Sequence, residues 1–149
     1  MRCFFFALRG FAYAVRTQRN MRVHLCFAFY VILAGLVTGI SQSEWLAVLL
    51  CIGFVTALEC ANTAVETLCD TLHPQKSCGI GTAKDTAAAA VLCAAAASAV
   101  VGARVFFQAE RICKAYSFLQ QKPVLACLII LTLFPAVLFV RGKPEGANK

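Results

Sequence analysis

The sequence is poor in charge. Only 14% of its 149 residues are charged and seven are acidic, whereas 60% of the chain is hydrophobic. A soluble domain usually carries about a quarter of its residues as charged side chains. The long apolar runs and the mean hydropathy of +0.76 instead indicate an integral membrane protein built as one domain.

The usual signatures of metal-binding and nucleotide-binding loops are also missing. The nine cysteines are an odd number, form no Cys-x-x-Cys pair and lie mostly in apolar runs, where cysteine behaves as a small hydrophobic residue. This pattern supports neither a disulfide framework nor a zinc site. The segment 79–84 resembles a phosphate-binding loop only loosely, because Asp85 stands where the Walker pattern requires Ser or Thr.

The apolar segments predict an all-α membrane fold. A membrane helix needs about 17–25 residues, and four segments approach this length once their flanks are counted. The third segment is rich in alanine, which suits close helix packing. The expected single membrane domain, 1–149, has a surface helix at 1–22, spans at 25–40, 45–70, 86–107 and 124–140, and a tail at 141–149.

The first 22 residues favour an amphipathic helix on the membrane surface. Arg2, Arg9 and Arg16 recur every seven residues and therefore share one helix face, while aromatic and aliphatic residues occupy the other faces. A signal peptide is the alternative, because the segment 12–14 reads Ala-Tyr-Ala. However, Arg9 interrupts the apolar run and leaves it shorter than the usual signal sequence.

The basic residues predict a topology with both termini in the cytoplasm. Ten of them lie before the first expected span, between the second and third, or after the fourth. The other four lie in the third connection, which is alternatively an interfacial helix with Arg104 reaching out from a helix end. The dispersed charges argue against a nucleic-acid-binding patch.

A polar stripe interrupts the second expected span. Glu59, Asn62, Glu66 and Asp70 fall within an arc of about 80° on one helix face, over about 16 Å. Ionised groups at membrane depth are costly and are therefore rare and usually functional. The stripe, together with the adjacent Thr63, must face protein, water or a metal ion rather than lipid.

A second polar group, Lys84-Asp85, precedes the third expected span. The expected connection 73–82, with Pro74, Gly79 and Gly81, places this pair on the same membrane side as the end of the stripe. Carboxylates near a lysine suit magnesium and phosphate. Spacing alone leaves ion or proton transport, and a structural network between helices, as open alternatives.

These residues carry a family resemblance. The pattern Glu59-x-x-Asn62-Thr63-Ala64-x-Glu66-x-x-x-Asp70, followed by Lys84-Asp85, resembles the prokaryotic diacylglycerol kinase and undecaprenol kinase family. The segments 19–24, 73–74 and 83–88 resemble the start of the family's first span, its loop and its entry to the third span. The match covers about residues 4–108, and the fourth span resembles the C-terminal extension of longer members.

The resemblance implies a homotrimer in the bacterial inner membrane, with composite active sites at the cytoplasmic face. The family transfers the γ-phosphate of magnesium ATP directly to a lipid hydroxyl, without a phospho-enzyme. By position, Glu59 is implied as the general base and Glu66 as the magnesium ligand. Asn62 is implied to help hold substrate or phosphate, and Lys84 to contact the phosphates. Asp70 and Asp85 are implied to order the nucleotide and the lysine.

One position departs from the family pattern. The family usually has a glutamate where this chain has Gln18, and that glutamate joins the magnesium site. Gln18 keeps an oxygen but lacks the charge, so the resemblance implies weaker metal binding there. The acceptor stays open between diacylglycerol and undecaprenol, although the N-terminal segment leans toward the undecaprenol group. A small multidrug-type transporter and a non-catalytic assembly subunit stay as alternatives.

Overall fold

The described part of the chain is entirely helical, as the sequence predicts. A computed structural model describes residues 2–73 and 78–142. It contains α1 (Arg2–Thr17), α2 (Arg19–Thr38), α3 (Gln42–Leu72), α4 (Cys78–Phe106), α5 (Ala109–Gln121), α6 (Pro123–Leu131) and α7 (Leu133–Arg141). Most of the expected tail lies outside the described residues, as do Pro74 and the other residues up to 77.

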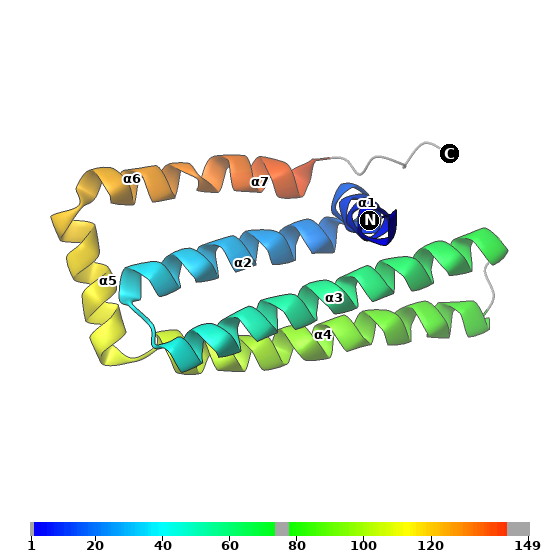
Figure 1. Ribbon diagram of the computed structural model, residues 1–149, viewed down its shortest axis with the longest axis horizontal. Helices are drawn as coiled ribbons and strands as arrows, with labels where there is room; N and C mark the ends of the chain where they lie inside the picture. Colours follow the sequence, from blue (N-terminus) through cyan, green and yellow to red (C-terminus); the bar gives the residue numbers. More distant parts are fainter. Residues whose placement is uncertain (1, 74–77, 143–149) are drawn as a thin grey trace.

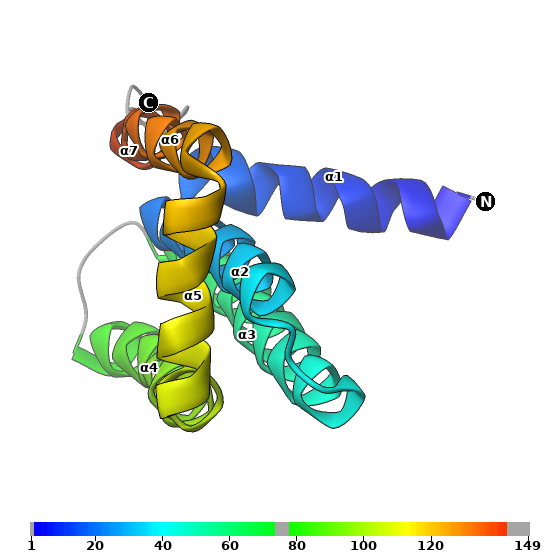
Figure 2. The same cartoon turned by 90° about the vertical axis from the view of Figure 1, so that its left-hand side faces the viewer.

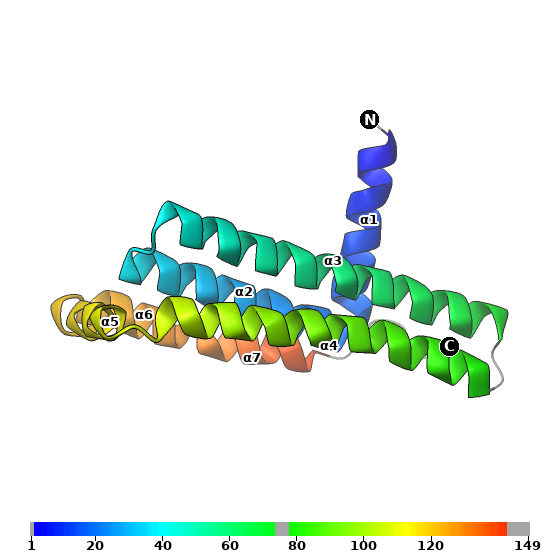
Figure 3. The ribbon, with the colours of Figure 1, turned by 90° about the horizontal axis from the view of Figure 1, so that it is seen from below.

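The long helices form a layered bundle. Helix α3 packs between α4 and α2, and α7 lies on the other side of α2 (Figure 1). Helix α5 crosses the end of the bundle at which α2 and α4 finish (Figure 2). Helix α1 projects sideways from the bundle instead of running along it (Figure 3). This places the start of α2, the end of α3 and the start of α4 toward one end of the molecule.

Four stretches are long and apolar enough to cross a membrane: α2, α3, residues 79–106 and residues 123–141. This confirms the expected fold class. Helix α1 is not among them, and its exposed large side chains include Phe4, Phe5 and Leu8, which fits a helix lying on a membrane surface. Many of the other large apolar side chains are also exposed, as expected for a bundle that lipid or further protein covers.

Three expected boundaries differ from the structure. Helix α1 ends at Thr17, and Arg19 already starts α2, so residues up to 22 do not form one surface helix. Helix α4 begins at Cys78, within the expected connection 73–82. Its Gly79 and Gly81 lie within the helix and lack the positive φ of a turn. Glycine weakens a helix but does not forbid it, so the two glycines do not mark a loop here. Lys84 and Asp85 therefore lie inside α4 rather than in front of it.

The fourth apolar stretch is broken at Thr132. Helix α6 ends there and α7 begins at Leu133. Pro135 lacks the backbone N–H that would bond the carbonyl of Leu131, which explains an interruption one turn before the proline. The Thr132 hydroxyl donates to the carbonyl of Ile129 over 2.6 Å at this break.

The connection from α2 to α3 is tightly defined. Gly39 ends α2 with φ 65°, the left-handed conformation that glycine adopts without strain. Ser41 then starts α3 through a capping box: its side chain accepts from the Glu44 N–H, and the Glu44 carboxylate accepts from the Ser41 N–H. A Cβ on Gly35 would lie 2.8 Å from the Trp45 ring, so the two helices depend on this glycine for close contact.

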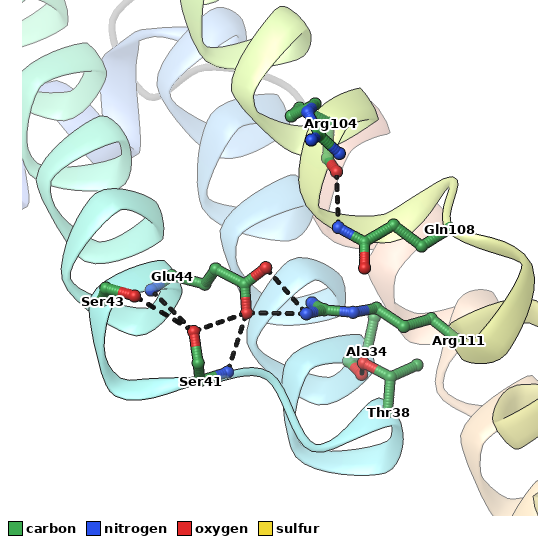
Figure 4. A network of polar contacts seen from close by, with 8 residues as sticks. All are labelled: Ala34, Thr38, Ser41, Ser43, Glu44, Arg104, Gln108 and Arg111. Atoms are coloured by element: carbon green, nitrogen blue, oxygen red, sulfur yellow. Dashed lines mark hydrogen bonds and ion pairs between the residues drawn. The ribbon is translucent and has the colours of Figure 1, made fainter.

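The Glu44 carboxylate also fastens α5 to the bundle. The Arg111 Nη2 donates to both of its oxygens over 2.7 Å (Figure 4). The Arg111 and Glu44 side chains are 13% and 23% exposed, which limits competition from water. The third connection, expected as either a plain connection or an interfacial helix, thus contains the helix α5 with a fixed attachment to the start of α3.

We predict that Glu44 contributes to stability in two separable ways. Ser41→Ala removes the Ser41 side-chain bonds of the capping box and is expected to cost about 1 kcal/mol. Arg111→Met removes the ion pair alone. Glu44→Ala removes the ion pair and the carboxylate's bonds to Ser41, so it is expected to lower the melting temperature most. Thermal unfolding in detergent, followed by circular dichroism, measures the order. An Arg111→Met variant that melts like the wild type would show that the ion pair does not fasten α5.

Candidate functional site

The polar residues singled out from the sequence gather where three helices approach. The second half of α3 carries Glu59, Asn62 and Glu66, and the first turns of α4 carry Lys84. The junction of α1 and α2 adds Gln18 from the side. Figure 1 shows α3 and α4 continuing past α1 at this end of the bundle. The site is therefore built from the surface helix and two spans.

Glu66 is the centre of an acid–amide cluster, which consists of Gln18, Asn62 and Glu66. The Gln18 amide donates to Glu66 Oε2 over 2.8 Å, across 48 positions of sequence. The Asn62 amide, one helical turn away on α3, donates to Oε1 over 2.9 Å. Both carboxylate oxygens thus have a polar partner, which meets the requirement for a half-buried charge.

Gln18 reaches Glu66 because of its position at the elbow between α1 and α2. It is the single residue between the two helices and has extended backbone angles, φ −101° and ψ 121°. Its side chain makes no capping bond to the start of α2, although it occupies the N-cap position. The amide is consequently available to cross to α3.

Glu59 is the most deeply buried of the acidic candidates, with 1% of its surface exposed. Neither of its carboxylate oxygens has a hydrogen-bond partner among the described residues. The Oδ1 atom of Asn62, one turn further along α3, is likewise buried and lacks a partner within this part of the chain. Unsatisfied buried oxygens are uncommon and often mark positions that act on another group.

Lys84 connects α4 to the end of the stripe. Its Nζ donates to Asp70 Oδ1 over 2.6 Å, with side-chain exposures of 32% for Lys84 and 67% for Asp70. The lysine is also close enough to Glu66 for their charges to interact. Asp85 is exposed and makes no hydrogen bond or ion pair that the described residues reveal, so the structure does not bring it into the group.

The donor set fits a hard cation only in part. Across the described ranges, no cluster of three or more His, Cys, Asp or Glu side chains could hold a metal ion. Glu66 nevertheless lies between two amides, and turning either amide by half a rotation presents an oxygen instead of an NH₂ group. Magnesium accepts one or two carboxylates together with neutral oxygens and water. Glu66 with Gln18 and Asn62 therefore suits magnesium, with one protein charge.

A groove of about 700 Å³ runs between α1 and α3. Its walls are mostly apolar and include Phe11 and Tyr13 of α1 and Cys60, Thr63 and Ala64 of α3. The Thr63 hydroxyl itself bonds to the carbonyl of Glu59 over 2.8 Å. Glu59 itself is not among the lining residues, and the mostly apolar wall is a suitable surface for a lipid tail.

Reasoning from the sequence missed one buried residue near the site. Arg22 is only 5% exposed, whereas the charge pattern predicts simply one of the basic residues in front of the first span. Its position carries a signal, because Arg22 lies in the first turn of a largely apolar helix, where the helix dipole disfavours a cation. The contacts that bury it come from residues distant in the sequence.

Comparisons with known proteins confirm the resemblance inferred from the motifs. A family model described as prokaryotic diacylglycerol kinase matches residues 5–106. The chain is 35% identical over 103 residues to an undecaprenol kinase of Bacillus subtilis (strain 168), covering 69% of this chain and 84% of that protein. A diacylglycerol kinase of Synechocystis sp. is 37% identical over 100 residues, which cover 66% of this chain and 57% of the relative. No solved structure gives a significant match.

Gln18 yields a prediction about magnesium that needs no catalytic assay. In a Gln18→Glu variant, two carboxylates face each other where the wild type has a 2.8 Å hydrogen bond. We expect a lower melting temperature than wild type without divalent cations, and a larger stabilisation by Mg²⁺. Gln121→Glu adds the same charge at an exposed position in α5 and serves as the control. Equal Mg²⁺ shifts in both variants and wild type would contradict a metal position at Gln18 and Glu66.

Proposed function

The chain belongs to the prokaryotic diacylglycerol kinase family, a family of lipid kinases, and on this premise we propose that it phosphorylates a membrane lipid hydroxyl with Glu59 as the general base. The observation that carries the proposal is the position of Glu59. Its carboxylate is buried and lacks a partner among the described residues, one turn along α3 from Asn62 of the acid–amide cluster.

The proposed reaction is a direct transfer. Glu59 accepts the proton of the lipid hydroxyl while the hydroxyl oxygen forms a bond to the γ-phosphorus of ATP and the bond to ADP breaks. A general base must lie within hydrogen-bond reach of the proton it takes. In this proposal a lipid tail lies in the groove between α1 and α3, where Cys60 and Thr63 are the lining residues next to Glu59 along the helix, and its hydroxyl must reach past them to the buried carboxylate.

The rest of the stripe is proposed to hold ATP. Glu66 would bind magnesium with oxygens from Gln18 and Asn62, and the bound ion would neutralise charge on the phosphates. Lys84 would contact the phosphates, and its 2.6 Å bond to Asp70 holds the ammonium near the cluster. Asp85, exposed on the next position of α4, is proposed to help order the nucleotide from outside the cluster.

The acceptor we favour is undecaprenol, with diacylglycerol as the second candidate. Both are lipids with a primary hydroxyl, and the groove between α1 and α3 offers an apolar wall that suits either tail. The undecaprenol kinase relative supports the first choice because its match extends over 84% of its length, against 57% for the diacylglycerol kinase. The N-terminal segment 19–24 points in the same direction.

The proposed setting is the inner membrane of a bacterium, with the site at the cytoplasmic face. The structure has four candidate spans, and the basic residues that precede the first one lie at the end that carries the site. A homotrimer with sites shared between protomers is part of the proposal, because the family resemblance implies it. The extensive exposed apolar surface leaves room for such contacts.

A non-catalytic subunit of the same family is the second candidate. The observation that favours it is Gln18, an uncharged residue at the position where the family usually has a glutamate. The transporter alternative has lost its support, since the family is one of lipid kinases. Measurable phosphorylation by the purified chain would exclude the non-catalytic alternative.

We predict that Glu59→Gln abolishes most of the activity. Loss of a general base lowers the rate by about 10²–10⁴-fold, and glutamine preserves the shape of the side chain. Purified protein in mixed micelles with labelled ATP and Mg²⁺, offered undecaprenol or diacylglycerol separately, gives the measurement. Glu110→Gln, an exposed acid in α5, is the matched control and should keep the wild-type rate. A Glu59→Gln enzyme with full activity would remove Glu59 from the mechanism.

We also predict that Lys84→Met weakens ATP binding. Removing one charged hydrogen bond to phosphate raises the KM for magnesium ATP by about tenfold or more, while the KM for the lipid stays unchanged. Asp70→Asn, which removes the charge that holds the ammonium, should have a smaller effect in the same direction. Steady-state kinetics with each substrate varied in turn separates the two constants. An increase confined to the lipid KM would place Lys84 at the acceptor instead.

A further inference from the structure

Arg22 joins the carboxyl ends of two helices that lie far apart in the sequence. Its Nη1 donates to the carbonyl of Arg16 in the last turn of α1 over 3.2 Å. Its Nη2 donates to the carbonyl of Gly142, just past the end of α7, over 2.8 Å. No carboxylate pairs with the guanidinium in the part of the chain that the structure describes. The cation is instead held by carbonyls at the negative ends of two helix dipoles.

This contact is the last in a series between α2 and the C-terminal span. Tyr30 bonds to the Thr132 hydroxyl over 3.1 Å, and the Cys26 thiol approaches the carbonyl of Ala136 at 3.9 Å. Arg22, Cys26 and Tyr30 are spaced by four residues and therefore share one face of α2. Polar contacts between membrane helices hold them in register, because lipid offers these groups no alternative partner.

These contacts attach the C-terminal span, which lies outside the family match, to the start of α2, where Gln18 enters the site. The family model ends at residue 106, whereas α6 and α7 occupy residues 123–141. Arg22 lies four positions after Gln18 and bonds to the carbonyl two positions before it. The elbow that directs the Gln18 amide to Glu66 is thus tied to the end of α7 through one side chain.

We propose that Arg22 is a positioning residue: it ties the end of the C-terminal span to the elbow between α1 and α2 and thereby holds Gln18 against Glu66. The tie itself is independent of the proposed lipid kinase activity, but its effect on magnesium ATP rests on that activity. Arg22 acts through Gln18 and touches neither substrate. The C-terminal span therefore contributes to the site without supplying a residue to it.

The first experiment measures the tie without catalysis. The backbone N–H of Gln18 donates to the carbonyl of Ala14, and the backbone N–H of Gly142 donates to the carbonyl of Leu138. Exchange of these two backbone hydrogens with deuterium therefore reports on both ends of the link. Arg22→Gln should accelerate exchange in both segments together. Arg19→Gln, an exposed arginine in the same helix, should accelerate neither. Acceleration in only one segment, or in none, would overturn the tie.

The second experiment tests the effect on the site with a double-mutant cycle in the whole chain. Arg22→Gln is expected to raise the KM for magnesium ATP by about tenfold and to leave the lipid KM unchanged. In a Gln18→Ala background the same substitution should add less than about twofold. Additive effects, or a change in the lipid KM alone, would show that Arg22 does not act through Gln18.

A conservative variant keeps the test decisive if Arg22→Gln fails to fold. Arg22→Lys retains the charge but lacks the fork that reaches two carbonyls at once. It should give intermediate exchange rates and an intermediate KM for magnesium ATP, and the effect on KM should vanish again with Gln18→Ala. Wild-type values for Arg22→Lys would contradict the two-carbonyl tie. A wild-type chain that phosphorylates neither lipid would overturn the proposed function and leave the exchange experiment valid.

Discussion

The structure depends on one constraint: polar side chains inside an apolar bundle must find their partners within the protein. The stripe on α3 carries carboxylates and an amide into a segment long enough to cross a membrane. Lipid cannot satisfy these groups. The Glu66 carboxylate is therefore met by Asn62 on its own helix and by Gln18 from the elbow before α2. This requirement brings the surface helix against α3 and so assembles the candidate site.

The same constraint operates at the other polar positions of the bundle. Glu44 satisfies the start of α3 and holds Arg111 of α5, and Arg22 donates to carbonyls at the ends of α1 and α7. Glu59 departs most from this rule among the described residues, because both of its buried carboxylate oxygens lack a partner, whereas Arg22, Asn62 and Arg111 each leave a single buried atom without one. An acid left open on both oxygens is consistent with reserving it for a substrate hydroxyl, as proposed.

Much of the fold could be predicted because it follows from local patterns. Apolar length predicts four spans, heptad spacing of arginines predicts the surface helix, and the 3.6-residue period places Glu59, Asn62 and Glu66 on one face. Helix α4 begins earlier than the sequence predicts, because Gly79 and Gly81 are tolerated in a helix. The break at Thr132 has a local signal in Pro135. The buried state of Arg22 had to come from the structure, because its partner Gly142 lies 120 positions away. The separation of Asp85 from the cluster also depends on the exact start of α4.

The central claim is that the stripe and the elbow together form a site for direct transfer of phosphate to a lipid. The most direct measurement uses the purified wild-type chain in mixed micelles with Mg²⁺ and ATP labelled in the γ-phosphate. The lipid and the protein are separated after rapid quenching, and the label in each fraction is counted together with the ADP formed. The account predicts label in the lipid equal to the ADP, and none on the protein. Label on the protein, or none in the lipid with either acceptor, would contradict it.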